Sequence, residues 1–278
     1  IEIFATGGRN YSTAALAATI AATWISGSSF VIGINYGYQD GLLKFLANMG
    51  AVFNLLIVGY IFAPRMKEFM QNLSVADIMG DLYGDKIRII TSITGFISSV
   101  GMVALQLKIL SSIFVYFGSV SADYSIYLSA LVLVLYSVFG GIRAVVFTDF
   151  VQFITFIIVV PSIALAIWNA INFSDNHDAY QRLQEHLFLT KSTSGTDYIT
   201  LFFYFLIPSL EPALIQRVIV GNSTKQITNS FQNAAIIYTV YIFIAAFTGI
   251  MLYAYNTDLQ IADLFGFMID EFAFSGLK

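Results

Sequence analysis

The sequence contains no cysteine and few charged residues, and each shortage excludes a class of protein. Without cysteine there can be no disulfide scaffold, thiolate nucleophile or cysteine-bound metal ion. Asp, Glu, Lys and Arg make up only 11% of the 278 residues, too few to cover the surface of a soluble domain. The net charge of -4 comes without a basic tract, so we expect no nucleic-acid partner.

Histidine is scarce as well, since only His177 and His186 occur. Both lie in one polar segment with Asp175, Asp178 and Glu185, which could bind a metal ion but is more simply explained as a solvated loop. The sequence also lacks a Walker-type glycine loop, an HExxH motif and a GxSxG motif. We therefore expect neither an enzyme nor a bound cofactor, and nothing in the chain supports nucleotide-driven pumping.

Hydrophobic residues make up 58% of the chain, and its mean hydropathy is +0.77. They form runs of about 20 residues, the length of a helix that crosses about 30 Å of hydrocarbon. Runs such as ITFIIVVPSIALAIW are apolar on every face, unlike the alternating strands of a β-barrel. We predict an all-α membrane protein with about seven transmembrane helices, at roughly 11–35, 41–63, 88–117, 124–140, 144–169, 198–220 and 229–254.

Two of the predicted helices are interrupted near their centres. The first contains Ser26, Gly27, Ser28 and Ser29 together, where the backbone can unwind and offer carbonyl oxygens to a hard cation such as sodium. Small residues at this position could equally serve close helix packing. The predicted sixth helix is interrupted by two prolines, at 208 and 212. A pair of broken helices in these positions favours a substrate site near the middle of the membrane.

Three ionisable residues lie at membrane depth, where each needs a partner or water: Asp149, Lys108 and Glu211. For Asp149 we favour a role near a bound cation, whereas Lys108 could pair with a carboxylate or extend toward the interface. Aromatic side chains on the interrupted helices, Trp24, Tyr204 and Phe205, could cover a substrate or attract a cationic one.

Several stretches of the sequence resemble the sodium:solute symporter family, which includes sodium-coupled proline, sugar, pantothenate and choline transporters. They are GGR at 7–9, ATWISGSSF at 22–30, AxQLK at 104–108, GGIRAVVFTDFVQ at 140–152 and EPALIQR at 211–217. The resemblance implies a leucine-transporter-type bundle of two inverted repeats. Residues 1–278 would then form one transmembrane domain, with a first repeat at about 11–169, an outer loop at about 170–197 and the start of a second repeat at about 198–254. We expect the chain to begin mid-protein and to stop before the remaining helices.

The resemblance also implies a set of binding residues. It places a sodium ion, as the coupling ion, on the backbone carbonyls of Ala22 and Ile25, and Asp149 matches the family's acidic residue near this site. In the family, hydroxyl groups from a later helix complete the site, and this chain does not include that helix. The expected substrate-binding residues are Trp24, Ser26, Ser28, Tyr204, Pro208 and Pro212.

These positions lead to one functional expectation and one alternative. We expect sodium-coupled symport of a small organic solute by alternating access, in a multi-pass protein of the plasma membrane, such as a bacterial inner membrane. The solute could resemble proline, choline or betaine, a sugar or pantothenate. Trp24 and Pro208 stand where the proline transporters carry an aspartate and a tyrosine, which weakens a proline assignment. The alternative is a transporter-like membrane sensor attached to a signalling kinase.

Overall fold

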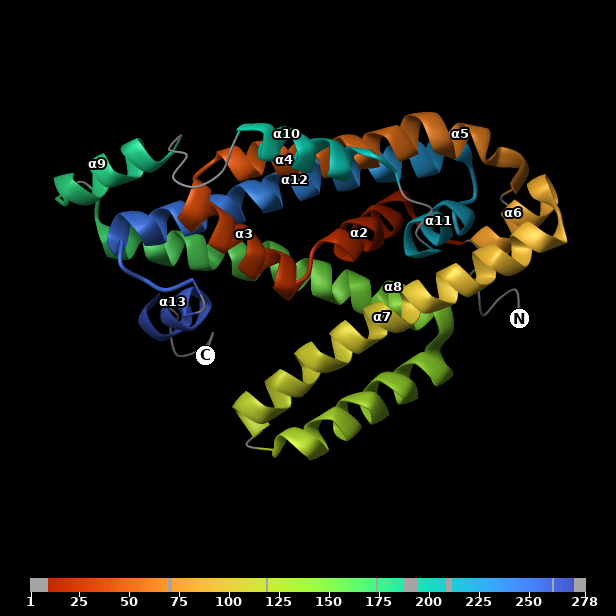
Figure 1. The fold of residues 1–278 in the computed structure, drawn as a ribbon, viewed down its shortest axis with the longest axis horizontal. Helices are drawn as coiled ribbons and strands as arrows, with labels where there is room; N and C mark the ends of the chain where they lie inside the picture. Colours follow the sequence, from red (N-terminus) through yellow and green to blue (C-terminus); the bar gives the residue numbers. More distant parts are fainter. Residues whose placement is uncertain are drawn as a thin grey trace. The chain divides into compact units, whose positions relative to one another are not determined.

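The computed structural model describes residues 10–69, 72–118, 120–173, 175–187, 195–208, 212–261 and 263–272. These residues are almost entirely helical, and no β-strand occurs among them (Figure 1). This agrees with the predicted all-α class.

The first predicted span is a bent pair of helices, α2 (Thr13–Trp24) and α3 (Gly27–Asp40), which meet at an angle of 59°. Residues 25 and 26 between them are not helical, and we call them the first break. The helix α3 ends at Gly41, whose φ of +60° is readily adopted only by glycine.

The chain continues through α4 (Leu43–Ile57), a π-helical turn (Val58–Phe62) and α5 (Ala63–Arg65), which together form one apolar span. A 3-10 turn (Lys67–Phe69) and the short helix α6 (Val75–Tyr83) follow. Ser74 begins α6 by accepting a hydrogen bond from the Asp77 N–H, as an N-cap residue does.

The two longest helices are α7 (Asp85–Gly118) and α8 (Ala122–Ile171). Ser111 on α7 and Ser125 on α8 are hydrogen-bonded through their hydroxyl groups, 2.5 Å apart. We predicted separate spans at roughly 124–140 and 144–169, whereas the helix runs without interruption through both. Within α8, Ala144–Ile171 is long enough to cross a membrane, and Asp123–Leu135 is a shorter apolar segment.

The predicted outer loop contains a helix that the sequence reading missed, α9 (His177–His186). The sixth predicted span consists of α10 (Gly195–Leu206) and α11 (Pro212–Ile219), and we call residues 207–211 between them the second break. The long helix α12 (Thr224–Tyr255) and the short α13 (Leu264–Phe272) complete the described chain.

By length and composition, four helices in the described residues can cross a membrane, or five if the bent pair α2–α3 counts as one span. We predicted seven. The difference arises because α10 and α11 are only 12 and 8 residues long, and because the apolar segment at the start of α8 is also short.

The chain divides into two compact units, each with its own packing. The first contains residues 1–16, 63–149 and 209–227, and the second contains residues 17–62, 150–208 and 228–278. In the first unit, α6 packs against α7 and α11 around a core of Val75, Ile78, Ile215 and Ile219.

In the second unit, glycines allow two pairs of helices to approach closely. On α3, a methyl group added at Gly37 would collide with the Ala246 carbonyl of α12, and one at Gly249 of α12 would collide with the Ile34 carbonyl of α3. On α4, a methyl group at Gly50 would collide with the Phe202 carbonyl of α10. These contacts bring α3 against α12 and α4 against α10.

Candidate functional site

The first break redirects the hydrogen bonds that a continuous helix would make. The Ile25 N–H still donates to the Ala21 carbonyl, at 2.9 Å, but the Ser26 N–H donates to Ser29 Oγ, at 2.8 Å, and not to the Ala22 carbonyl four residues earlier. Ser29 N–H in turn donates to Ser26 Oγ, at 3.1 Å. This reciprocal capping box starts α3 and releases the Ala22 carbonyl from the helical ladder.

Side chains from two distant helices hold the two carbonyls of the first break. Gln152 Nε2 of α8 donates to the Ile25 carbonyl at 3.2 Å. The Tyr241 hydroxyl of α12 donates to the Ser26 carbonyl at 3.1 Å and lies 2.9 Å from Ser29 Oγ. A backbone carbonyl has two lone pairs, so the Ile25 oxygen can accept the Gln152 hydrogen bond and still face a cation.

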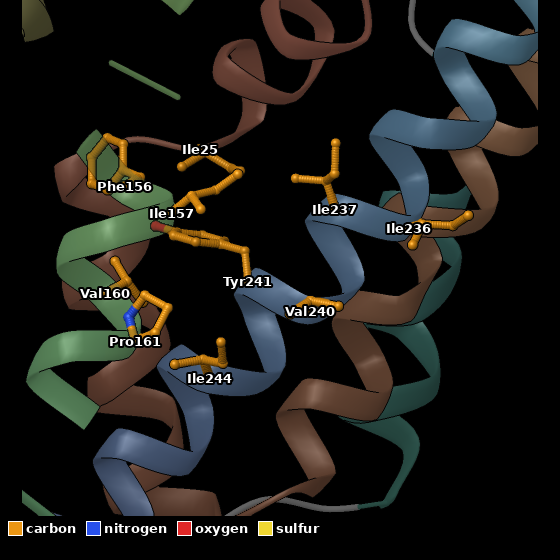
Figure 2. A pocket seen from close by; sticks show the side chains of 10 residues that line it. All are labelled: Ile25, Phe156, Ile157, Val160, Pro161, Ile236, Ile237, Val240, Tyr241 and Ile244. Carbon is orange, nitrogen blue, oxygen red and sulfur yellow. The ribbon is translucent and has the colours of Figure 1, made fainter. Parts of the chain in front are cut away.

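An apolar cavity of about 250 Å³ adjoins the first break. Figure 2 shows Ile25 at one end of it, side chains of α8 along one wall and side chains of α12 along the other. The Tyr241 ring reaches from α12 toward Ile25 and Ile157, with its hydroxyl oxygen on the side of α8. The full lining is Ile25, Phe156, Ile157, Val160, Pro161, Ile236, Ile237, Val240, Tyr241 and Ile244.

The predicted substrate residues are only partly brought together. Trp24, Ser26 and Ser28 lie at the first break, where the Ser26 and Ser28 hydroxyls are 2.9 Å apart and the Trp24 ring lies 5.8 Å from that of Tyr238. Trp24 Nε1 is buried and has no hydrogen-bond partner in the described part of the chain.

The remaining predicted substrate residues lie at the second break. Tyr204 on α10 is 73% exposed and contacts the Phe205 ring, and no hydrogen bond or ring contact among the described residues joins it to Trp24. Pro208 is the second residue after the end of α10. Pro212 begins α11 in the first unit, where its ring lies close to Gly95 of α7. Glu211 falls outside the described residues.

The second break also has a polar side chain that holds it. Asn54 of α4 is 4% exposed, and its Nδ2 donates to the Phe205 and Ile207 carbonyls at 3.1 Å each. These carbonyls lie at the end of α10, where a helix leaves its last carbonyls without intrahelical donors. Sequence reasoning missed Asn54, although an asparagine inside an apolar helix is a signal that could have identified it.

Asp149 and Arg217 form an ion pair in the first unit. Arg217 Nη2 of α11 lies 2.7 Å from Asp149 Oδ2 of α8, and the two side chains are 6% and 17% exposed. The Asp149 carboxylate, predicted to act near a bound cation, is therefore neutralised by a guanidinium. Lys108 lies on an exposed face of α7.

The histidines of the outer segment do not both lie in a solvated loop. His177 is exposed, but His186 is fully buried, and its Nε2 is 3.1 Å from the Gly37 carbonyl. The His186 ring stacks on Tyr253, with centroids 3.7 Å apart. The Leu42 N–H also donates to the Leu187 carbonyl at 2.9 Å, so the end of α9 is attached to the turn after α3. No group of three or more metal-binding side chains occurs among the described residues.

Comparisons with known proteins identify similar chains. Over 145 residues the chain is 29% identical to the high-affinity choline transporter 1 of Caenorhabditis elegans, an alignment that covers 52% of this chain and 25% of the transporter. The solved structure of a Na+-coupled sialic acid symporter, in a substrate-bound outward-open state, matches 97% of this chain with a TM-score of 0.75 at 16% identity. The chain spans 60% of that structure.

The structural match confirms the predicted fold class, a leucine-transporter-type helical bundle, although at this identity it shows the fold alone. The profile of the sodium:solute symporter family matches residues 4–266, nearly the whole chain. The resemblance found in the sequence is confirmed, and the chain belongs to the sodium:solute symporter family, a family of membrane transporters and not of enzymes.

Proposed function

We propose that this chain is part of a protein that carries a small organic solute across a membrane together with sodium, by alternating access. Sodium is the coupling ion and the solute is the cargo. The protein is a multi-pass membrane protein, and we assign it to the plasma membrane, in a bacterium the inner membrane.

The observation that carries this proposal is the first break. In hydrocarbon, non-helical backbone is tolerated only where its polar groups are satisfied by protein or line a cavity. Here the Ala22 carbonyl does not receive the Ser26 N–H, and the Ile25 carbonyl is held by a side chain from another helix. Hard cations such as sodium favour oxygen ligands of this kind, so we assign both carbonyls to the sodium site.

Asp149 remains the third proposed sodium residue. Its ion pair with Arg217 supports a second role, which is to balance the buried charge of Arg217, because a buried carboxylate with one guanidinium partner is close to neutral overall. The two roles predict different behaviour for an Asp149→Asn, Arg217→Gln double variant.

We propose that the solute binds beside the first break, against Trp24, Ser26 and Ser28, with Tyr204, Pro208 and Pro212 contributing from the second. Trp24 supports this because its buried indole N–H has no partner in the described residues, and an unpaired buried donor is costly unless a ligand accepts from it. Its ring face could also attract a quaternary ammonium group. Together with the choline transporter relative, this favours a choline- or betaine-like solute over a proline-, sugar- or pantothenate-like one.

Uptake by the full-length parent protein in vesicles tests the proposal. Labelled choline, betaine, proline, sugars and pantothenate are offered with and without an inward sodium gradient, and the variants Asp149→Asn and Trp24→Leu are compared with the unaltered protein. We expect sodium-dependent uptake of one solute, weaker sodium dependence in Asp149→Asn and a raised KM for the solute in Trp24→Leu.

The outcomes discriminate between the proposals. Sodium-dependent uptake of a sugar that Trp24→Leu leaves unaffected would retain the symporter and reject the quaternary ammonium assignment. If the folded parent protein takes up none of these solutes but binds one of them, the sensor alternative replaces the transporter.

A further inference from the structure

We propose that Asn54 and Tyr241 are a reciprocal pair of positioning residues. Asn54 lies on α4, which follows the first interrupted helix, and it holds the second break. Tyr241 lies on α12, which follows the second interrupted helix, and it holds the first break. This inference rests on the proposed function, because the first break, held by Tyr241, carries the proposed sodium carbonyls together with solute residues, whereas the second break, held by Asn54, carries proposed solute residues alone.

The first member of the pair is Asn54, in the helix that follows the first break. It lies on α4, one helical turn after Gly50, whose close contact with the Phe202 carbonyl brings α4 against α10. From there the buried Asn54 amide reaches the Phe205 and Ile207 carbonyls at the second break. Phe205 lies in the last turn of α10 and Ile207 directly follows it, where a helix leaves its carbonyls without donors from its own ladder.

The second member is Tyr241, in the helix that follows the second break. It lies on α12, two helical turns before Gly249, on the face that approaches α3. Its hydroxyl reaches the Ser26 carbonyl and Ser29 Oγ at the first break. The arrangement at the two breaks is therefore the same. Two helices cross closely at a glycine, and a polar side chain four or eight residues from that glycine reaches the backbone at the break of the other helix.

Both contacts lie within the second unit and join residues far apart in sequence, 151 residues for Asn54 and Phe205 and 215 for Tyr241 and Ser26. Because α4 is joined directly to α3, and α12 follows α11, a displacement of either broken helix moves the helix that holds the other break. The pair thus links the geometry of the two breaks, and it gives sodium and solute binding a physical route by which each affects the other.

Two isosteric substitutions test the pair in the full-length parent protein. Tyr241→Phe removes only a hydroxyl, and Asn54→Leu removes the amide at similar volume. The matched controls are Tyr255→Phe, on the same helix as Tyr241 and bonded to Glu271, and Asn48→Leu, on the same helix as Asn54 and without an assigned hydrogen bond in the described part of the chain.

In uptake assays, we expect Tyr241→Phe to raise the sodium concentration for half-maximal uptake about two- to tenfold at saturating solute, the effect of losing a hydrogen bond. Asn54→Leu should raise the solute KM by a similar factor, about two- to tenfold, at saturating sodium. The control variants should leave both constants unchanged. A purely structural role would lower the amount of folded protein and the maximal rate without moving either constant, and that result would overturn the proposal.

Hydrogen exchange of the purified protein provides a readout that does not depend on transport. Tyr241→Phe should speed amide exchange at residues 24–30, and Asn54→Leu at residues 203–208, again by about two- to tenfold. Unchanged exchange at these segments overturns the positioning role even if uptake is impaired. Faster exchange in a protein whose unaltered form shows no sodium-dependent uptake retains the positioning role and rejects the proposed function.

Discussion

Removing either member of the Asp149–Arg217 ion pair should destabilise the protein strongly. With exposures of 17% and 6%, the two side chains are largely withdrawn from water, and their nearest atoms are 2.7 Å apart. Replacing one partner leaves the other as an uncompensated buried charge, which costs about 3–5 kcal/mol. We therefore expect Asp149→Asn and Arg217→Gln each to lower the free energy of unfolding by about that amount.

The double variant should be less damaging than the sum of the two single variants, because it leaves no unpaired charge. Because the unpaired charge accounts for most of each single effect, the double variant should be more stable than either single variant, so the interaction energy in this double-mutant cycle should exceed about 3–5 kcal/mol. The assay is reversible unfolding of the full-length parent protein in mixed micelles. If the single effects add within about 0.5 kcal/mol, the two groups do not interact, and the ion pair does not account for the loss of stability.

A second ion pair provides a matched control. Arg88 Nη2 lies 2.7 Å from Asp77 Oδ1, the same distance, but these side chains are 45% and 33% exposed. Exposed pairs contribute about 0–1 kcal/mol, so Arg88→Gln should be nearly neutral.

The same cycle separates the two roles of Asp149. If Asp149 only balances the charge of Arg217, the double variant should regain both stability and sodium dependence. If Asp149 also acts at the sodium site, the double variant should regain stability but still respond weakly to sodium.

Three further predictions concern other contacts. Gly37→Val should prevent α3 from approaching α12 and reduce the yield of monodisperse protein, whereas Gly101→Ala, where the added methyl group meets nothing within 4 Å, should not. Gln152→Met, which removes the donor to the Ile25 carbonyl at similar length, should raise the sodium concentration for half-maximal uptake about two- to tenfold, and unchanged sodium dependence would argue against it. Partial burial raises the pKa of Asp77, but hydrogen bonds from Ser74 and Arg88 and the Arg88 charge outweigh it, so the pKa lies below its usual value. The resulting stabilisation is present above the unfolded-state pKa of about 3.9 and is lost as the pH falls toward the lower pKa of Asp77 in the folded protein. In Asp77→Asn, the Tm should therefore fall less steeply below about pH 4 than in the unaltered protein.

The sequence was sufficient to predict the helical class, the family and the position of both breaks. Four small residues at 26–29 and two prolines at 208 and 212 interrupt otherwise apolar runs, and such interruptions act locally, so they can be read from the sequence. The helix α9 could also have been predicted, because Asn176 is a favourable N-cap and Ala179 and Leu183 form an apolar face at four-residue spacing.

The side chains that hold the breaks could not be predicted in the same way. Gln152 and Ile25 are 127 residues apart, and nothing near either residue indicates the other. The burial of His186 depends likewise on Gly37 and Tyr253, which belong to other helices. The Arg217 partner of Asp149 was also missed, since the two residues are 68 positions apart in the sequence. These contacts depend on the tertiary arrangement of the helices, which residue type and spacing do not encode.

Because α9 is attached to the turn after α3, a label on α9 would report the motion of α3. The end of α9 is hydrogen-bonded to the backbone of Gly37 and Leu42, at the second half of the first broken helix. When α3 tilts, α9 should therefore move with it. Tyr180 on α9 is exposed, and this stretch of the protein has no cysteine of its own. A fluorophore on a cysteine introduced at Tyr180 would follow the motion of α3 from the surface, without a label inside the binding site.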